Sequence, residues 1–191
     1  MQKYIFKKGS WENDFMYVYG PQAGIYGKKF RQEENFVINT EEKDSKDDNY
    51  VSIVTKERYG IGTKISTVCD FDSYGAPLIV FSDDIEERNG TLFYKLHFEV
   101  VAWENGCNVW HILPYWERAE KPFINTKIAK IPFDIECKSK IKMSVTLLKG
   151  KIECEVNGNK FTVENPDIPE LCHVGITACE GVNRFYELTI E

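Results

Sequence analysis

Three tryptophans and several polar side chains lie close together between Lys95 and Trp116. An Asn105-Gly106 pair interrupts this segment, and such a pair favours a two-residue turn between antiparallel strands. The turn would set four opposed pairs, which are Trp103 with Asn108, Val101 with Trp110, Glu99 with Ile112, and Lys95 with Trp116. Opposed residues share one face of a sheet. The spacing therefore predicts one face that mixes aromatic and ionisable side chains, while the other face, with Phe98 and Val100, joins the core.

A face of this composition suits the binding of sugars. Sugar rings have apolar C–H faces that stack on aromatic rings, and their hydroxyl groups need hydrogen-bond partners. The candidate binding residues are Trp103, Trp110, Trp116, His97, Glu99, Asn108 and Lys95. The alternative is that an N-terminal strand or loop covers the tryptophans and makes a second small core. We expect an oligosaccharide or glycan as the partner if this face is open.

Glu99 is the candidate catalytic residue if the chain is an enzyme. Glycosidases use two carboxyl groups, roughly 5–5.5 Å apart in retaining enzymes and roughly 6.5–9.5 Å apart in inverting ones. Glu99 has no carboxylate partner on its own strand, and the pair Glu153 and Glu155 is expected on an outer, solvated face. A non-catalytic binding module is therefore the leading hypothesis. The alternatives are a glycoside hydrolase, or a degenerate relative, that uses Glu99, and a protein-interaction module.

An acidic turn follows Ser82 and contains Asp83, Asp84 and Glu86. Calcium prefers several oxygen ligands, so these carboxylates are the candidate metal ligands. An acidic loop between strands is more often simply solvated. We therefore expect no cofactor, with calcium as the one candidate.

The elements that would position these residues are strands. Most segments alternate with period two, none sustains a helical stripe, and turn signals recur at short intervals. Separate strands are expected at Gly24–Phe30, Gly60–Asp72, Pro77–Ser82, Thr91–Trp103, Cys172–Cys179 and Arg184–Glu191, among others. The charged segment from Thr40 to Asn49 is expected to be a loop. The pattern predicts one all-β domain over residues 1–191, with a core that includes Phe98, Val100, Cys154, Val156, Val174 and Ile176.

The last third of the chain carries a recognisable order of elements. The stretch KMSVTLLKGKIECEVNG has two strands and two tight turns, and VENPDIPEL and HVGITACEGVNRFYELTIE follow it; YGAPLIVFSDD comes earlier. Over residues 50–191 this order resembles the concanavalin A-like lectin/glucanase superfamily, close to laminin-G-type domains. The resemblance implies a two-sheet antiparallel jelly-roll sandwich with glycans on the concave sheet and, in some members, calcium at the edge. The Glu-x-Asp-x-Glu motif of the superfamily's glucanases is absent.

Composition excludes several other classes of function. The net charge is −6 and no run of Lys and Arg exceeds two residues, so no nucleic-acid partner is expected. No segment approaches the roughly 20 apolar residues of a membrane span, and no signal peptide is recognised, so we expect a cytoplasmic protein without a membrane partner. The six cysteines include no C-x-x-C motif and are expected to be reduced and mostly buried. The oligomeric state and the identity of the sugar are not determined by the sequence.

Overall fold

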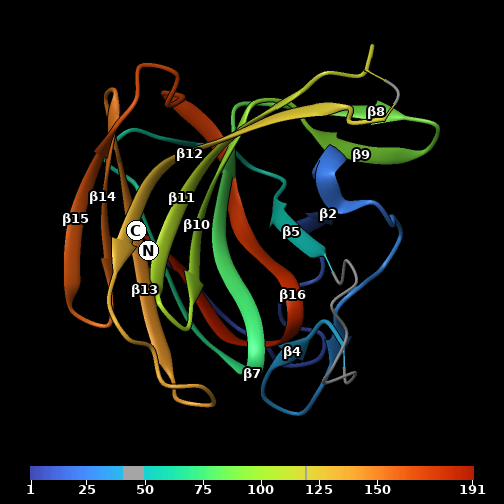
Figure 1. Cartoon of the computed structure of the whole chain (residues 1–191). Coiled ribbons are helices and arrows are strands. Elements are labelled where there is room, and N and C mark those ends of the chain that lie inside the picture. Colours follow the sequence, from blue (N-terminus) through green and yellow to red (C-terminus); the bar gives the residue numbers. More distant parts are fainter. Residues whose placement is uncertain (41–49, 119) are drawn as a thin grey trace.

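The computed structural model describes residues 1–40, 50–118 and 120–191 (Figure 1). The expected loop at residues 41–49 lies outside these ranges. Within them the chain consists of strands, connecting loops and one 3-10 turn at Pro21–Ala23. No helix in the described ranges is long and apolar enough to cross a membrane.

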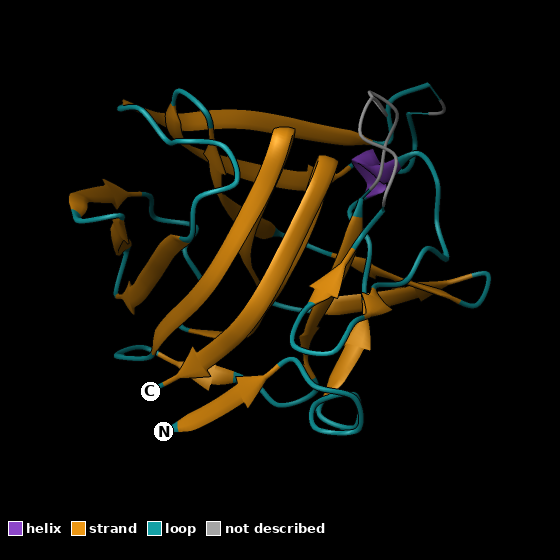
Figure 2. Cartoon of the chain, turned by 90° about the horizontal axis from the view of Figure 1, so that it is seen from below, coloured by secondary structure: helices purple, strands orange, loops and turns teal. Residues whose placement is uncertain are grey.

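Two antiparallel sheets form a jelly-roll sandwich. The front sheet contains, in order, β12 (Phe123–Pro132), β11 (Gly106–Pro114), β10 (His97–Trp103), the second half of β7 (Lys64–Ser82), the first half of β16 (Leu171–Ile190), β5 (Val51–Thr55) and β2 (Phe15–Tyr17). The back sheet contains, in order, β15 (Asn159–Glu164), β14 (Lys151–Val156), β13 (Ile141–Leu148) and the other halves of β7 and β16. β1 (Gln2–Ile5) and β4 (Val37–Ile38) both pair with this half of β16, at different positions along it, and β3 (Arg31–Gln32) pairs with β4. β6 (Tyr59–Gly60) pairs with the start of β16, and β8 (Ile85–Arg88) and β9 (Thr91–Tyr94) form a separate hairpin. Figure 2 shows β1 beside the end of β16, so the two termini are neighbours.

The two long strands β7 and β16 bend from one sheet into the other. The sequence pattern predicted two separate strands in each case, and this prediction is wrong because the hydrogen-bonded pairing continues through the bends. Gly75 and Gly181 face each other there, and Gly181 has a φ of 51°. A Cβ atom on Gly181 would overlap the carbonyl oxygen of Tyr74. Glycine at this position therefore allows the close backbone approach that a continuous bend requires.

The main core lies between the two sheets. Alternate side chains of each strand point into it, and the rings of Phe81 and Phe98 stack there with centroids 5.1 Å apart. Burial of a large apolar side chain contributes about 1.5–3 kcal/mol. The six residues predicted for the core are all buried, which confirms that part of the pattern: Phe98, Val100, Cys154, Val156, Val174 and Ile176.

The outer face of the front sheet is partly covered by other parts of the chain. Val18 from the N-terminal segment and Tyr94 from the β8–β9 hairpin are fully buried against Leu78 and Val80. The strand predicted over Thr91–Trp103 is interrupted between β9 and β10, and this break places Tyr94 outside the main core. The strand expected at Gly24–Phe30 is absent, and that segment is a loop. Within the described ranges, the part of the outer face beside β10, β11 and β12 is open and holds a cavity.

Candidate functional site

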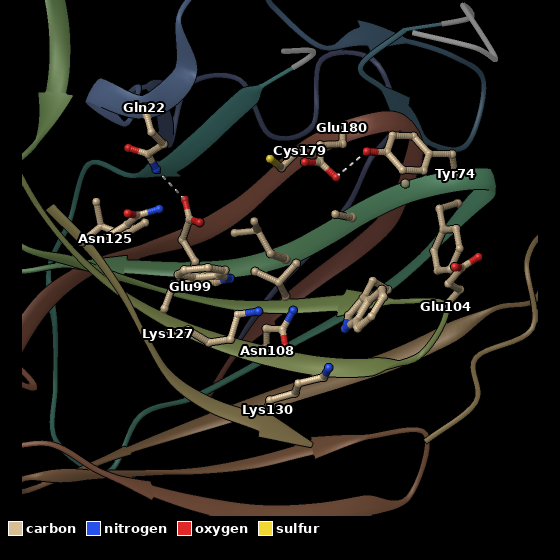
Figure 3. Close-up of a pocket in the computed structure, with 18 residues that line it drawn as sticks. Gln22, Tyr74, Glu99, Glu104, Asn108, Asn125, Lys127, Lys130, Cys179 and Glu180 are labelled. Carbon is tan, nitrogen blue, oxygen red and sulfur yellow. Dashed lines mark hydrogen bonds between the residues drawn. The ribbon is translucent and has the colours of Figure 1, made fainter. Parts of the chain in front are cut away.

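The open part of the front sheet holds a cavity of about 530 Å³ (Figure 3). Leu78 and Val101 line it from β7 and β10, and Trp103 and Trp110 contribute indole rings from β10 and β11. The bend at Tyr74 forms part of its rim. This volume falls within the range of roughly 300–1,000 Å³ that is typical of small-molecule sites.

The β10–β11 hairpin brings the two tryptophans to the same face, although in a different register from the expected one. The turn consists of Glu104 and Asn105, and the observed pairs are Trp103 with Gly106, Val101 with Asn108, Glu99 with Trp110, and His97 with Ile112. The predicted register is wrong by two residues. Because side chains alternate with period two, this shift leaves every side chain on its predicted face. Gly106 lies in β11, paired with Trp103 and Pro132, and a Cβ on it would overlap the carbonyl oxygen of Ile131 in β12, so this position requires glycine.

Four of the predicted site residues line the cavity, and they are Glu99, Trp103, Asn108 and Trp110. His97 lies behind Glu99 and is fully buried. Lys95 and Trp116 are not part of the cavity, so the structure does not bring the predicted set together as a whole.

Lys95 and Trp116 lie elsewhere because the paired strands are shorter than expected. β10 begins at His97, so Lys95 precedes it, and its ammonium group lies 2.7 Å from Asp84. β11 ends at Pro114, and Trp116 packs against Phe93 with ring centroids 4.8 Å apart. Both residues therefore hold the β8–β9 hairpin in place.

Glu99 lies at one end of the cavity within a buried hydrogen-bond network. The hydroxyl of Tyr50 and the amide of Gln22 donate to its Oε1 atom at 2.8 and 3.1 Å, and Nε2 of His97 lies 3.7 Å from it. Burial and the neighbouring Glu99 raise the pKa of Tyr50 well above its usual value, so its proton stays in place to donate. Gln22 comes from the 3-10 turn, and this contact closes one end of the cavity (Figure 3).

Two lysines from β12 approach the indole rings. Nζ of Lys127 lies 4.7 Å from the ring centroid of Trp110, and Nζ of Lys130 lies 5.8 Å from that of Trp103. Residues three apart in a regular strand point to opposite faces. Here a β-bulge skips Ile128 in the pairing with β11, and both lysines consequently point to the cavity side.

Three buried polar atoms around the cavity have no hydrogen-bond partner among the described residues: Nε1 of Trp103, Oδ1 of Asn108 and Oε1 of Gln22. Buried polar atoms are usually paired, and an unpaired one costs about 1–3 kcal/mol. Each of these atoms has almost no exposed area, so a ligand could pair with it only after a neighbouring side chain moves aside. Sequence reasoning missed four residues at this site, because strand alternation does not indicate which distant segment covers a face. These residues are Gln22, Tyr50, Lys127 and Lys130.

The acidic turn at Asp83, Asp84 and Glu86 does not form a cluster of ligands that could hold a metal ion. Within the described ranges no three carboxylate, imidazole or thiol groups are arranged to hold a metal ion. Asp84 pairs with Lys95, while Glu86 lies 3.0 Å from the guanidinium of Arg88 and accepts the indole N–H of Trp116. Asp83 is partly buried, which raises the pKa of its carboxyl group. Two of the three candidate calcium ligands are thus occupied by positive partners.

The other carboxylate pairs lie on the back sheet. Arg184 contacts Asp70 at 3.0 Å and Asp72 at 2.9 Å, so these two carboxylates form a buried ionic cluster. Glu153 and Glu155 point outward from β14, as predicted. Neither pair lines the cavity at Glu99.

No family model and no curated protein matches the sequence. Solved structures do match the fold. The carbohydrate-binding module CBM66 from Bacillus subtilis has a TM-score of 0.63 at 11% identity, over 93% of this chain and 95% of that one. A family 16 endo-glucanase from Bacteroides ovatus, in complex with G4G3G-2F-DNP, has a TM-score of 0.64 at 10% identity, over 100% and 99%.

β-Agarase A from Zobellia galactanivorans has a TM-score of 0.66 at 9% identity, over 98% of this chain and 87% of that one. At sequence identities this low, the structural similarity shows a shared fold but does not show a shared activity. The chain has the concanavalin A-like jelly-roll sandwich fold, as the sequence resemblance implied.

Proposed function

We propose that the protein is a non-catalytic carbohydrate-binding module whose ligand occupies the cavity beside β10, β11 and β12. The observation that carries the proposal is the combination of two tryptophans with carboxyl and amide side chains around one cavity, namely those of Glu99, Asn108 and Asn125. A sugar ring needs an aromatic surface for its C–H face and polar partners for its hydroxyl groups. The structural neighbours include a carbohydrate-binding module and glycoside hydrolases, which supports a carbohydrate ligand.

The surroundings of Glu99 favour binding over hydrolysis. Its Oε1 atom already accepts hydrogen bonds from Tyr50 and Gln22, a role that anchors the N-terminal segment. The other carboxylates that line the cavity are Glu104 and Glu180, which lie towards its opposite end (Figure 3). Hydrolysis of a glycoside by the usual route needs two carboxyl groups on either side of the scissile bond.

The covered part of the front sheet favours a short ligand. Gln22 closes one end of the cavity, and the buried cluster around Tyr94 occupies the remainder of the outer face. A long polysaccharide could not lie across the whole sheet without displacing these segments. We therefore expect one end of a glycan, or a short oligosaccharide, to enter beside the tryptophans.

A glycan-array screen followed by calorimetry tests this proposal. Trp103→Ala and Trp110→Ala are each expected to weaken binding by about 2 kcal/mol, or roughly thirtyfold, because each removes a central aromatic surface. Tyr115→Ala is the control, since Tyr115 is exposed and lies outside the cavity. Thermal unfolding of each variant checks that the fold is retained.

Three results would count against the proposal. Glycan binding that persists unchanged in both tryptophan variants would show that the binding site lies outside this cavity. Release of reducing sugar by the wild type, abolished in Glu99→Gln, would make the protein a glycoside hydrolase. A blank array with and without calcium would favour a protein-interaction module, to be sought by pull-down.

A further inference from the structure

We infer that the ligand is an acidic oligosaccharide, with a carboxylate or sulfate group held by Lys127 and Lys130. This inference rests on the proposed function and names the class of sugar that the cavity prefers. It is carried by the position of the two lysines, by their lack of ionic partners among the described residues, and by the contacts that a neutral sugar would have to displace.

The two ammonium groups have no carboxylate partner in the part of the chain that the structure describes. Among the described residues neither lysine forms an ion pair, and both side chains belong to exposed residues. The carboxylates of the cavity, by contrast, accept hydrogen bonds from nearby donors. Glu180 accepts from the hydroxyl of Tyr74 at 2.9 Å, and Glu104 accepts from the neighbouring Asn105 at 3.1 Å.

The lysines are aimed at the cavity by the fold. Lysine on an edge strand such as β12 commonly serves only to block edge-to-edge association. In that role the two side chains would have no reason to share a face. The bulge at Ile128 turns both towards the indole rings, and Figure 3 shows Lys127, Asn108 and Lys130 along one edge of the cavity.

The cation–π contacts discriminate between neutral and acidic sugars. A sugar that stacks on Trp110 must move the Lys127 ammonium away from the ring, and the same holds for Trp103 and Lys130. A neutral sugar loses these attractions without replacement. An acidic sugar draws each ammonium into an ion pair beside the ring, which frees the stacking surface and replaces the lost attraction.

The other polar groups around the cavity are consistent with an acidic sugar whose anionic group faces β12. Carboxylate and sulfate oxygens only accept hydrogen bonds, and the indole N–H of Trp103, which has no partner among the described residues, becomes a further donor if Lys130 moves off the ring. Glu104 lies in the β10–β11 turn and Glu180 lies at the bend of β16, and both line the cavity, where they can accept hydrogen bonds from sugar hydroxyls. An acidic sugar would therefore place its anionic group at β12 and its hydroxyl groups towards these two carboxylates.

The experiment compares three probes of equal length by calorimetry: a neutral galactose trimer, a galacturonic acid trimer and a sulfated galactose trimer. At least one acidic probe is expected to bind about tenfold more tightly than the neutral probe, and its affinity should fall as salt is raised. A preference for the uronate identifies a carboxylate, and a preference for the sulfated probe identifies a sulfate.

The double variant Lys127→Ala, Lys130→Ala is expected to lose this preference, with about a tenfold drop in affinity for the acidic probe. The matched control is Lys149→Ala, Lys160→Ala, which removes the same charge from exposed sites away from the cavity and should leave the affinity unchanged. Tighter binding of the neutral probe, or an unchanged affinity in the first variant, would overturn the inference and leave the proposed function intact. Absence of binding to any sugar would overturn both.

Discussion

The hydroxyl of Tyr50 donates a 2.8 Å hydrogen bond to Oε1 of Glu99, and this contact joins two segments that are 49 positions apart. Tyr50 immediately precedes β5, and Glu99 lies in β10. Gln22 adds a second bond to the same oxygen atom from the N-terminal turn. Three separate parts of the chain therefore meet at one carboxylate, which fixes the closed end of the cavity.

Tyr50→Phe is expected to lower the free energy of unfolding by about 1.5–3 kcal/mol. The substitution removes a buried hydrogen bond to a carboxylate and leaves Glu99 with fewer donors. Urea denaturation measures the change, with Tyr115→Phe as a control because Tyr115 is exposed. A variant as stable as the wild type would mean that the bond contributes nothing to the fold.

Gly175→Ala is expected to be severely destabilising. Gly175 lies in β16 opposite Val54 of β5, and a Cβ on it would overlap the carbonyl oxygen of Ile53. Overpacking against backbone costs about 3 kcal/mol, since a main-chain atom cannot move aside like a flexible side chain.

Gly60→Ala is the matched control, because the nearest atom to its added Cβ would be 3.7 Å away. Circular dichroism during thermal unfolding should place Gly175→Ala well below the wild type and Gly60→Ala close to it. Equal melting temperatures for the two variants would contradict the packing described for β5 and β16.

Trp116→Ala and Trp110→Ala are expected to have opposite effects. Trp116 packs against Phe93 and stacks with Arg88, so its removal should cost about 2 kcal/mol of stability and leave glycan affinity unchanged. Trp110 lines the cavity, and its removal should weaken binding more than folding. Calorimetry and urea denaturation on both variants separate the two roles. Loss of glycan binding in Trp116→Ala, with unchanged stability, would show that Trp116 belongs to the binding site and would contradict this prediction.

Alkaline pH is expected to destabilise the protein through its buried thiols. Burial raises the pKa of Cys107 and of Cys172 to about 12, whereas an unfolded thiol titrates near pH 8.5. The folded state therefore holds protons that the unfolded state releases. The stabilising contribution is complete below about pH 8.5 and is lost as pH rises towards 12, by up to about 1.4 kcal/mol per pH unit for each thiol.

Urea denaturation between pH 8 and pH 10.5 measures this dependence. Cys107→Ala should show a shallower fall in unfolding free energy than the wild type, because one of the titrating thiols is gone. Cys137→Ala is the control, since Cys137 is only half-buried. Identical slopes for wild type and Cys107→Ala would contradict the burial of Cys107.

The alternation of residues determined which side chains share a face. Trp103, Asn108 and Trp110 were placed together correctly even though the turn was misplaced, because a shift of two residues preserves the period-two pattern. The same alternation identified Phe98 and Val100 as core residues. The order of strands and turns in KMSVTLLKGKIECEVNG also pointed to the fold, since the local preferences there agree with the hairpin of β13 and β14.

Only the tertiary structure decided where the cavity begins and ends. Three features of the site depend on packing between distant segments: the contact of Gln22 with Glu99, the position of Tyr94 over the sheet, and the direction of the Lys127 side chain. Period-two alternation within one strand contains no information about such packing. The β12 bulge is a single extra residue in the pairing, invisible in the pattern of Ile128 and its neighbours. A strand's alternation is a local property of one chain segment, whereas a binding site is made where several segments meet.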